Sequence, residues 1–187
     1  MLRSPSMAVL LLAAAASCAG PATETPLPEA PAPTAQHAWL QPLVGTWDLT
    51  YRADAPDGSG PMEWTGTEVV SSIGTNWVVA VSEASSPQGG MTGRLTIGYD
   101  VERETYVGTW IDSIQTNLWT YDATLDEAGR TLSLVPTIEP RAAVPDPKRF
   151  RDEIELVDDD HRILTSWYQG DDGAWVQYLV IEATRAD

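Results

Sequence analysis

The stretch from Gly93 to Ser113, GRLTIGYDVERETYVGTWIDS, predicts two antiparallel strands joined by a short charged turn. Side chains alternate between the two faces of a strand, and residues that pair across a hairpin share a face. With 101–104 as the turn, the paired residues are Leu95 with Trp110, Ile97 with Gly108, and Tyr99 with Tyr106. One face of the hairpin is therefore apolar and aromatic, with Asp112 at its end, and we expect the rest of the chain to extend the hairpin on both sides.

Eight further segments of similar character flank this hairpin, and short polar or glycine-containing turns separate most of them. They span residues 46–53, 62–72, 76–84, 117–125, 131–138, 149–157, 161–169 and 175–184. Ten strands without a long helical period predict an all-β antiparallel barrel or sandwich. We favour a single closed barrel of about ten strands, because an open sheet of that size would leave two exposed edges.

Two segments do not fit the strand pattern. Residues 37–44, HAWLQPLV, predict a short helical turn with Trp39, Leu40 and Leu43 facing inward. Residues 139–148, EPRAAVPDPK, contain three prolines and predict an irregular connection, which is either a lid or a simple crossing loop.

The strand pattern also predicts which side chains face the interior. With the turn at 72–75, Val70 pairs with Trp77 and Trp64 pairs with Glu83, while Trp119 lies beside Trp110. The candidate ligand-binding residues on the inner face are Trp64, Glu68, Trp77, Glu83, Trp110, Asp112, Trp119 and Tyr121.

This inner face has two interpretations. The first is a cavity with aromatic walls and a few acidic groups, suited to a flat or cationic small molecule. The second is that the rings fill the barrel and the carboxylates lie at its wet rim, because small barrels can be filled by their own side chains. Gly66 and Gly108, which are predicted to face inward, favour empty volume.

The sequence predicts no catalytic residues, no metal site and no cofactor. A carboxylate among tryptophans can have a raised pKa, but Glu68, Glu83 and Asp112 come from different predicted strands, and solvated or hydrogen-bonded structural acids are the simpler interpretation. There are two histidines, His37 and His161, and no Gly-x-Ser-x-Gly motif, which argues against a Ser-His-Asp hydrolase. Asp158, Asp159 and Asp160 lack the spaced ligands and the glycine of a calcium loop, so an acidic turn is the simpler interpretation.

The N-terminal residues predict export. Residues 1–17 combine Arg3 with an uncharged apolar run, which is typical of a signal peptide. Ala16-Ser17-Cys18 resembles the lipobox of bacterial lipoproteins, which implies lipidation of Cys18; ordinary cleavage after Ser-Cys-Ala is the alternative. By the same resemblance, Ala19 favours anchoring at the outer membrane, facing the periplasm.

The predicted organisation is then a signal peptide at 1–17, a Pro/Ala-rich tether at 18–36 that begins with the lipidated Cys18, and a barrel domain at 37–187. The chain carries 27 acidic against 11 basic residues, a formal charge of −16. Such a surface repels nucleic acid and anionic lipid headgroups, so a lipid anchor is the only membrane contact expected.

Several motifs resemble a known superfamily. The Gly45-Thr46-Trp47 motif is similar to the Gly-x-Trp opening of calycins, which include the lipocalins and fatty-acid-binding proteins. Residues 98–100 (GYD), 106–112 (YVGTWID) and 183–185 (ATR) are similar to the uncharacterised bacterial calycin-like family known as domain of unknown function 1579. The resemblance extends from Trp39 to Arg185.

The resemblance implies a ten-stranded barrel with an internal cavity and no established activity. It also implies that Arg185 packs over Trp47 as a structural cation–π lock at one end of the barrel. Some calycin-like barrels bind haem through a histidine near the C-terminal strands, and His161 is the residue at that place.

The expected function is that of an envelope lipoprotein whose barrel binds a small apolar or aromatic ligand. An interaction protein with a filled barrel, acting through its acidic, arginine-containing surface, is the alternative. An enzyme that works in the cavity, or a haem-binding barrel, is a third.

Overall fold

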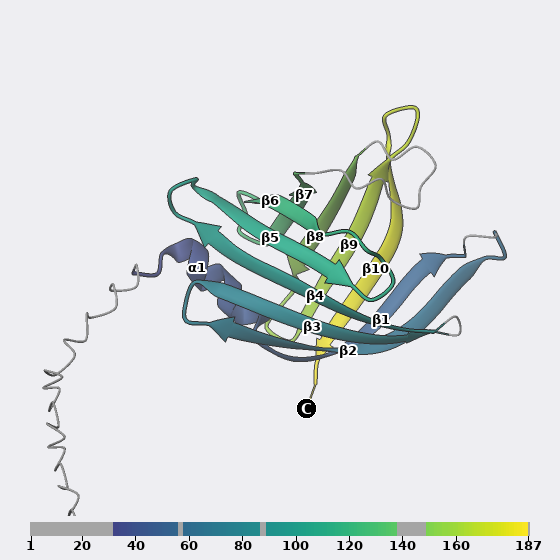
Figure 1. The fold of residues 1–187 in the computed structure, drawn as a ribbon, viewed down its shortest axis with the longest axis horizontal. Helices are drawn as coiled ribbons and strands as arrows, with labels where there is room; N and C mark the ends of the chain where they lie inside the picture. Colours follow the sequence, from purple (N-terminus) through teal and green to yellow (C-terminus); the bar gives the residue numbers. More distant parts are fainter. Residues whose placement is uncertain (1–31, 56–57, 87–88, 138–148, 187) are drawn as a thin grey trace, which may run out of the picture. The chain divides into compact units, whose positions relative to one another are not determined.

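The computed structural model describes residues 32–55, 58–86, 89–137 and 149–186, and these form an antiparallel barrel (Figure 1). Each strand pairs with its neighbours in sequence, and the last strand pairs with the first, so the barrel is closed. The expected ten-stranded all-β fold is confirmed. The strands are β1 (Gly45–Asp54), β2 (Pro61–Ile73), β3 (Trp77–Ser86), β4 (Gly89–Asp100), β5 (Thr105–Asp112), β6 (Trp119–Leu125), β7 (Thr131–Pro136), β8 (Phe150–Leu156), β9 (His161–Gln169) and β10 (Trp175–Arg185).

The central hairpin has the predicted register. Leu95 pairs with Trp110, Ile97 with Gly108 and Tyr99 with Tyr106, and β6 then places Trp119 opposite Trp110. Alternate residues of β4, β5 and β6 therefore share the inner face of the barrel, as the period-two pattern predicts.

The predicted register between β2 and β3 is wrong. Ile73 pairs with Trp77, so the turn contains the three residues 74–76, and Val70 pairs with Ala80 instead of Trp77. Gly74 has a positive φ of 59°, which glycine adopts easily, and this lets the chain reverse within three residues. Because the shift is an odd number of residues, every side chain of β3 changes face relative to the prediction.

Trp77 and Glu83 consequently lie on the outer face of the barrel. Both are exposed, whereas Val78 and Ser82 between them are buried. The ring of Trp77 covers its partner Gly98 on the outside, where a Cβ atom would collide with it. Trp77 and Gly98 therefore face each other on the outer surface of the barrel and not in the lumen.

A short helix covers one end of the barrel. The helix α1 (Ala35–Leu40) continues into the 3₁₀ helix η1 (Gln41–Leu43), and Leu40 and Leu43 are buried as predicted, while Trp39 is only half-buried. Tyr106 Oη donates a hydrogen bond to the Gln36 carbonyl at 3.0 Å, and Trp39 Nε1 donates to the Gly129 carbonyl at 2.9 Å. We call this the closed end of the barrel.

The helix starts at Ala35, two residues before the predicted domain boundary, and the Gln36 carbonyl already accepts a hydrogen bond from β5. The predicted signal peptide, Cys18 and most of the tether lie outside the described residues, as do residues 138–148 with the proline-rich connection. In the part of the chain that is described, no helix has the length and apolar character needed to cross a membrane.

The predicted packing of Arg185 over Trp47 is present at the closed end. The guanidinium carbon of Arg185 lies 4.3 Å from the centroid of the Trp47 ring. Arg185 also donates hydrogen bonds to the carbonyl oxygens of Pro42, Val44 and Asp159, and Trp47 Nε1 donates to the Leu43 carbonyl. The pair therefore ties the 3₁₀ helix to the last strand.

Candidate functional site

The half of the lumen away from α1 carries most of the inward-facing aromatic residues. We call this region the upper lumen. Strand pairing defines all its members except Tyr178, which lies in a bulge of β10 and contacts Phe150 and Tyr168 with its ring. They are Tyr51, Trp64, Trp110, Trp119, Tyr121, Phe150, Asp152, Ser166, Tyr168 and Tyr178.

The rings form two groups. Tyr51 and Trp64 are stacked, with centroids 5.2 Å apart and planes 10° from parallel. On the other wall, Phe150 contacts Trp119 edge to face at 5.4 Å and Tyr178 at 6.2 Å. These contacts hold flat apolar surfaces in fixed orientations, which is the usual construction of a pocket for a small ligand.

Solvent-accessible apolar side chains between these groups show that the lumen is not completely filled. Leu95, Leu164, Leu179 and Ile181 all point inward by strand pairing, yet each is only half-buried. Closer to β7 the packing is tight, and Leu132, Leu134 and Ile154 are fully buried. A close-packed core would leave no accessible surface on the inward leucines.

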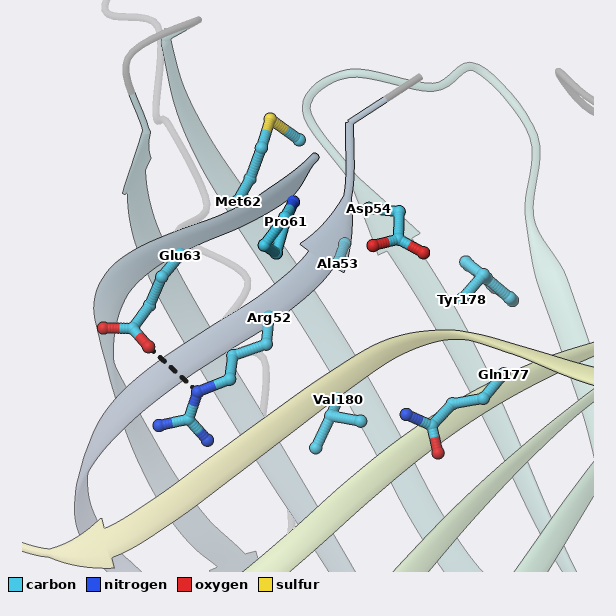
Figure 2. A pocket seen from close by; sticks show the side chains of 9 residues that line it. All are labelled: Arg52, Ala53, Asp54, Pro61, Met62, Glu63, Gln177, Tyr178 and Val180. Carbon is cyan, nitrogen blue, oxygen red and sulfur yellow. Dashed lines mark hydrogen bonds and ion pairs between the residues drawn. The ribbon is translucent and has the colours of Figure 1, made fainter. Parts of the chain in front are cut away.

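A pocket opens into the barrel wall beside the upper lumen (Figure 2). The pairing of β1 with β10 ends at Ala53 and Leu179, and β10 contains a bulge between Gln177 and Leu179. Past this point the β1–β2 hairpin and β10 diverge (Figure 1), and the space between them is a pocket of about 490 Å³. We call it the seam pocket; it is lined by Arg52, Ala53, Asp54, Pro61, Met62, Glu63, Gln177, Tyr178 and Val180.

The outer rim of the seam pocket is polar. Arg52 donates to Glu63 at 2.9 Å and forms an ion pair with Glu182 at 2.8 Å (Figure 2 shows the contact with Glu63). Tyr178 comes from the bulge on the opposite side, and its ring contacts the inward-facing rings of Phe150 and Tyr168. The pocket therefore has a charged outer rim and an aromatic inner wall.

A polar cluster of buried Tyr121, buried Ser166 and half-buried Asp152 lies behind Tyr178. Tyr121 Oη donates to Asp152 Oδ2 at 3.2 Å, and Ser166 pairs with Asp152 across β8 and β9, so the Ser166 side chain lies beside the carboxyl group on the same face. Burial raises the pKa of Asp152, against the smaller opposing effect of the neighbouring Ser166 and Tyr121 hydroxyl groups. Burial also raises the pKa of Tyr178 to about 12, so its hydroxyl is neutral at ordinary pH.

Sequence reasoning missed Asp152, Ser166 and Tyr178. The pattern of β8 contains a clue, since Phe150, Asp152, Ile154 and Leu156 occupy one face, and an acid in an otherwise apolar period-two series is unusual. The sequence contains no such clue for Tyr178, because the bulge interrupts the alternation that assigns side chains to a face.

Glu68 faces inward as predicted, but it lies deeper than the upper lumen. It forms a buried ion pair with Arg162 and accepts a hydrogen bond from Ser82 Oγ at 2.8 Å. The cavity beside this pair measures about 10 Å³, too small for an organic ligand. We therefore assign a structural role to Glu68.

Asp112 is at the inner rim as predicted, and its oxygens are already occupied. Asp112 accepts hydrogen bonds from Trp110 Nε1, from the backbone amides of Ile114 and Gln115, and from Gln115 Nε2. These bonds order the connection between β5 and β6, which fixes the orientation of the Trp110 ring.

The predicted inner set is thus divided by the structure. The upper lumen contains Trp64, Trp110, Trp119 and Tyr121. The pairing of β3 with β2 places Trp77 and Glu83 on the outer face of the barrel instead. His161 precedes the inward-facing Arg162 and points to the outside of the barrel, away from the lumen. Over the described ranges, the histidine and acidic side chains form no cluster of three or more that could hold a metal ion.

Solved structures of other proteins resemble this barrel. The S-type phycobiliprotein lyase CPES from Guillardia theta has a TM-score of 0.55 at 14% identity, covering 80% of this chain and 92% of the lyase. The protein Rv2717c from M. tuberculosis has a TM-score of 0.52 at 16% identity, covering 80% and 98%. At such identities the likeness concerns the fold.

The search of curated proteins found no match for the sequence. The model of a family described as "Protein of unknown function (DUF1579)" matches residues 32–185, which includes every strand of the barrel. The chain therefore belongs to the DUF1579 family.

Proposed function

We propose that this protein binds a small apolar or aromatic molecule in the upper lumen. The observation that carries the proposal is the set of inward-facing leucine and isoleucine side chains that keep solvent-accessible surface between two groups of aromatic rings. The seam pocket of about 490 Å³ lies in the neighbouring barrel wall, where Tyr178 lines it and contacts the inward-facing Phe150, and its volume is within the range of roughly 300–1,000 Å³ typical of small-molecule sites.

The positions of the inner acids support binding more than catalysis. Glu68 is neutralised by Arg162, and Asp112 is held by four hydrogen-bond donors, so neither is free to transfer a proton to a bound molecule. Among the structural neighbours, the phycobiliprotein lyase has a similar barrel. Its name describes an activity on another macromolecule. The enzymatic alternative would need an acid other than these two.

The alternative, a barrel filled by its own side chains, is supported only at the closed end. There the cavity measures about 10 Å³ and Leu132, Leu134 and Ile154 are fully buried. An interaction protein of this type would act through its outer face, where Trp77, Ile73 and Val69 are exposed.

We also propose that the protein is an exported lipoprotein with Cys18 as its lipidated first residue. The support is the sequence of residues 1–18 alone, since these residues lie outside the described ranges. A lipid anchor would give a ligand-binding barrel a fixed location in the cell envelope, with the proline-rich segment as the spacer.

Native mass spectrometry of the protein purified from its own cells tests the binding proposal. We expect a bound small molecule that is released under denaturing conditions and is absent when Trp110 and Trp64 are both replaced by alanine. A protein that carries no small molecule, and whose tryptophan fluorescence is unaffected by apolar aromatic compounds in solution, would contradict it.

A further inference from the structure

Asp152 differs from the other acids that face the lumen. Glu68 has an arginine partner, and Asp112 has four donors. Asp152 accepts a hydrogen bond from Tyr121 Oη and has Ser166 as its cross-strand neighbour, and no basic residue in the described part of the chain forms an ion pair with it.

This arrangement leaves Asp152 with unused hydrogen-bonding capacity. A carboxylate has about four acceptor positions, and the Tyr121 hydroxyl fills one of them. The residue points inward between Leu134 and Ser166, and it is only half-buried, so part of it faces the accessible lumen. Placing a hydrogen-bond acceptor in an apolar cavity costs free energy unless donors complete its hydrogen bonds.

Tyr178 connects this acid to the seam pocket. The bulge in β10 lies at Tyr178, which lines the pocket while its ring contacts Phe150, the residue two before Asp152 on the same face of β8. The three hydroxyl-bearing residues around Asp152 come from β6, β9 and β10. A molecule that enters at the seam therefore meets Tyr178 first and the carboxyl group behind it.

We infer that Asp152 is the hydrogen-bonding anchor for the ligand, and that the preferred ligand is a flat apolar molecule with an amine N–H donor at one end. The inference rests on the proposed function and specifies its ligand chemistry. The amine completes the acceptor positions of Asp152, while the rings of Phe150 and Trp119 contact the apolar body of the molecule. Tyr178 lines the seam pocket beside this anchor, and its ring contacts Phe150, so it contributes to the apolar contact with the ligand.

Two probe compounds of nearly the same size and shape test this inference. 1-Aminoanthracene carries the donor and anthracene lacks it, and both report binding through their own fluorescence. We expect the wild-type protein to bind 1-aminoanthracene about tenfold more tightly than anthracene, as one hydrogen bond to an acidic acceptor would give.

Three variants separate the possible outcomes. Asp152→Leu should abolish the preference for the amine and keep the affinity for anthracene, whereas Glu83→Gln, on the outer face, should change neither. Tyr178→Phe should retain the preference and shift the affinity for both probes together.

The inference is overturned if both probes bind the wild-type protein equally, or if Asp152→Leu keeps the tenfold preference; in either case ligand binding in the lumen survives. If neither probe binds, the proposed function itself fails together with the anchor. Circular dichroism checks that each variant is folded. Should Asp152→Leu not fold, Asp152→Asn takes its place, and an unchanged preference for the amine in that variant overturns the inference.

Discussion

Arg162 and Glu68 form an ion pair that crosses the inside of the barrel, from β9 to β2, although 94 residues separate them in the sequence. Both side chains are nearly inaccessible to solvent, at 7% and 9%. The guanidinium of Arg162 also lies over the Trp47 ring, 4.7 Å from its centroid, so one arginine connects the ion pair to the Trp47–Arg185 contact. These four residues make the closed end a single connected unit.

Replacing Glu68 by glutamine should destabilise the barrel strongly. The change leaves Arg162 buried without a countercharge, which typically costs about 3–5 kcal/mol. Chemical denaturation followed by tryptophan fluorescence measures the loss. Glu63→Gln is the matched control, because Glu63 pairs with Arg52 at the surface and should cost about 1 kcal/mol or less. Equal losses in the two variants would contradict the structural role given to Glu68.

Replacing Arg185 by leucine should loosen the closed end. Arg185 loses its contact with the Trp47 ring and its hydrogen bonds to three backbone carbonyls, and we expect a loss of about 2–4 kcal/mol in the free energy of unfolding. Arg185→Lys should recover only part of this, since an ammonium group lacks the planar fork that reaches several carbonyls at once. Full stability of the leucine variant would remove Arg185 from the lock.

Tryptophans inside and outside the barrel should respond differently to a ligand. Trp110→Phe, in the upper lumen, should reduce the quenching of protein fluorescence by 1-aminoanthracene, whereas Trp77→Phe should leave the quenching of the remaining tryptophans intact. The comparison uses the same substitution on both faces of the sheet. Quenching that depends on Trp77 would place the binding site on the outer surface.

The free energy of unfolding should depend on pH through the titration of Asp152. Burial raises its pKa above that of the unfolded chain, near 3.8, so the native state holds this proton when the unfolded state has lost it. The contribution of Asp152 to the free energy of unfolding therefore falls as the pH rises from about 4 through its pKa in the folded protein. Asp152→Asn lacks this effect, while the nearby Tyr121 and Tyr178 stay neutral in both proteins.

Measuring unfolding by urea at several values between about pH 4 and 7 tests this prediction. The stability of Asp152→Asn relative to the wild type should increase over that interval. A difference that is constant with pH would mean that Asp152 titrates in the folded protein as it does in the unfolded chain.

Cys18→Ser should release the protein from membranes. If Cys18 carries the lipid anchor, the serine variant loses its only proposed attachment, and the −16 charge of the chain opposes adsorption to anionic lipid. Fractionation of cells followed by detection of the protein gives the result. Membrane association that persists in the serine variant would count against lipidation.

The sequence by itself determined the strands and the register of the central hairpin. Period-two alternation is a local property, and a short turn such as 101–104 fixes which residues face each other on either side of it. The contact between Trp47 and Arg185 was also predictable, because the motifs at both ends of the domain resemble those of a family with that contact.

The register of β3 was decided by the three-residue turn at Gly74, which the sequence pattern does not distinguish from a four-residue turn. That single difference moved Trp77 and Glu83 from the lumen to the outside. The cluster around Asp152 depends on even less local information, since Tyr121, Ser166 and Tyr178 come from β6, β9 and β10 and meet only when the barrel closes and β10 bulges. Alternation assigns a side chain to a face, but closure and bulges decide which faces meet.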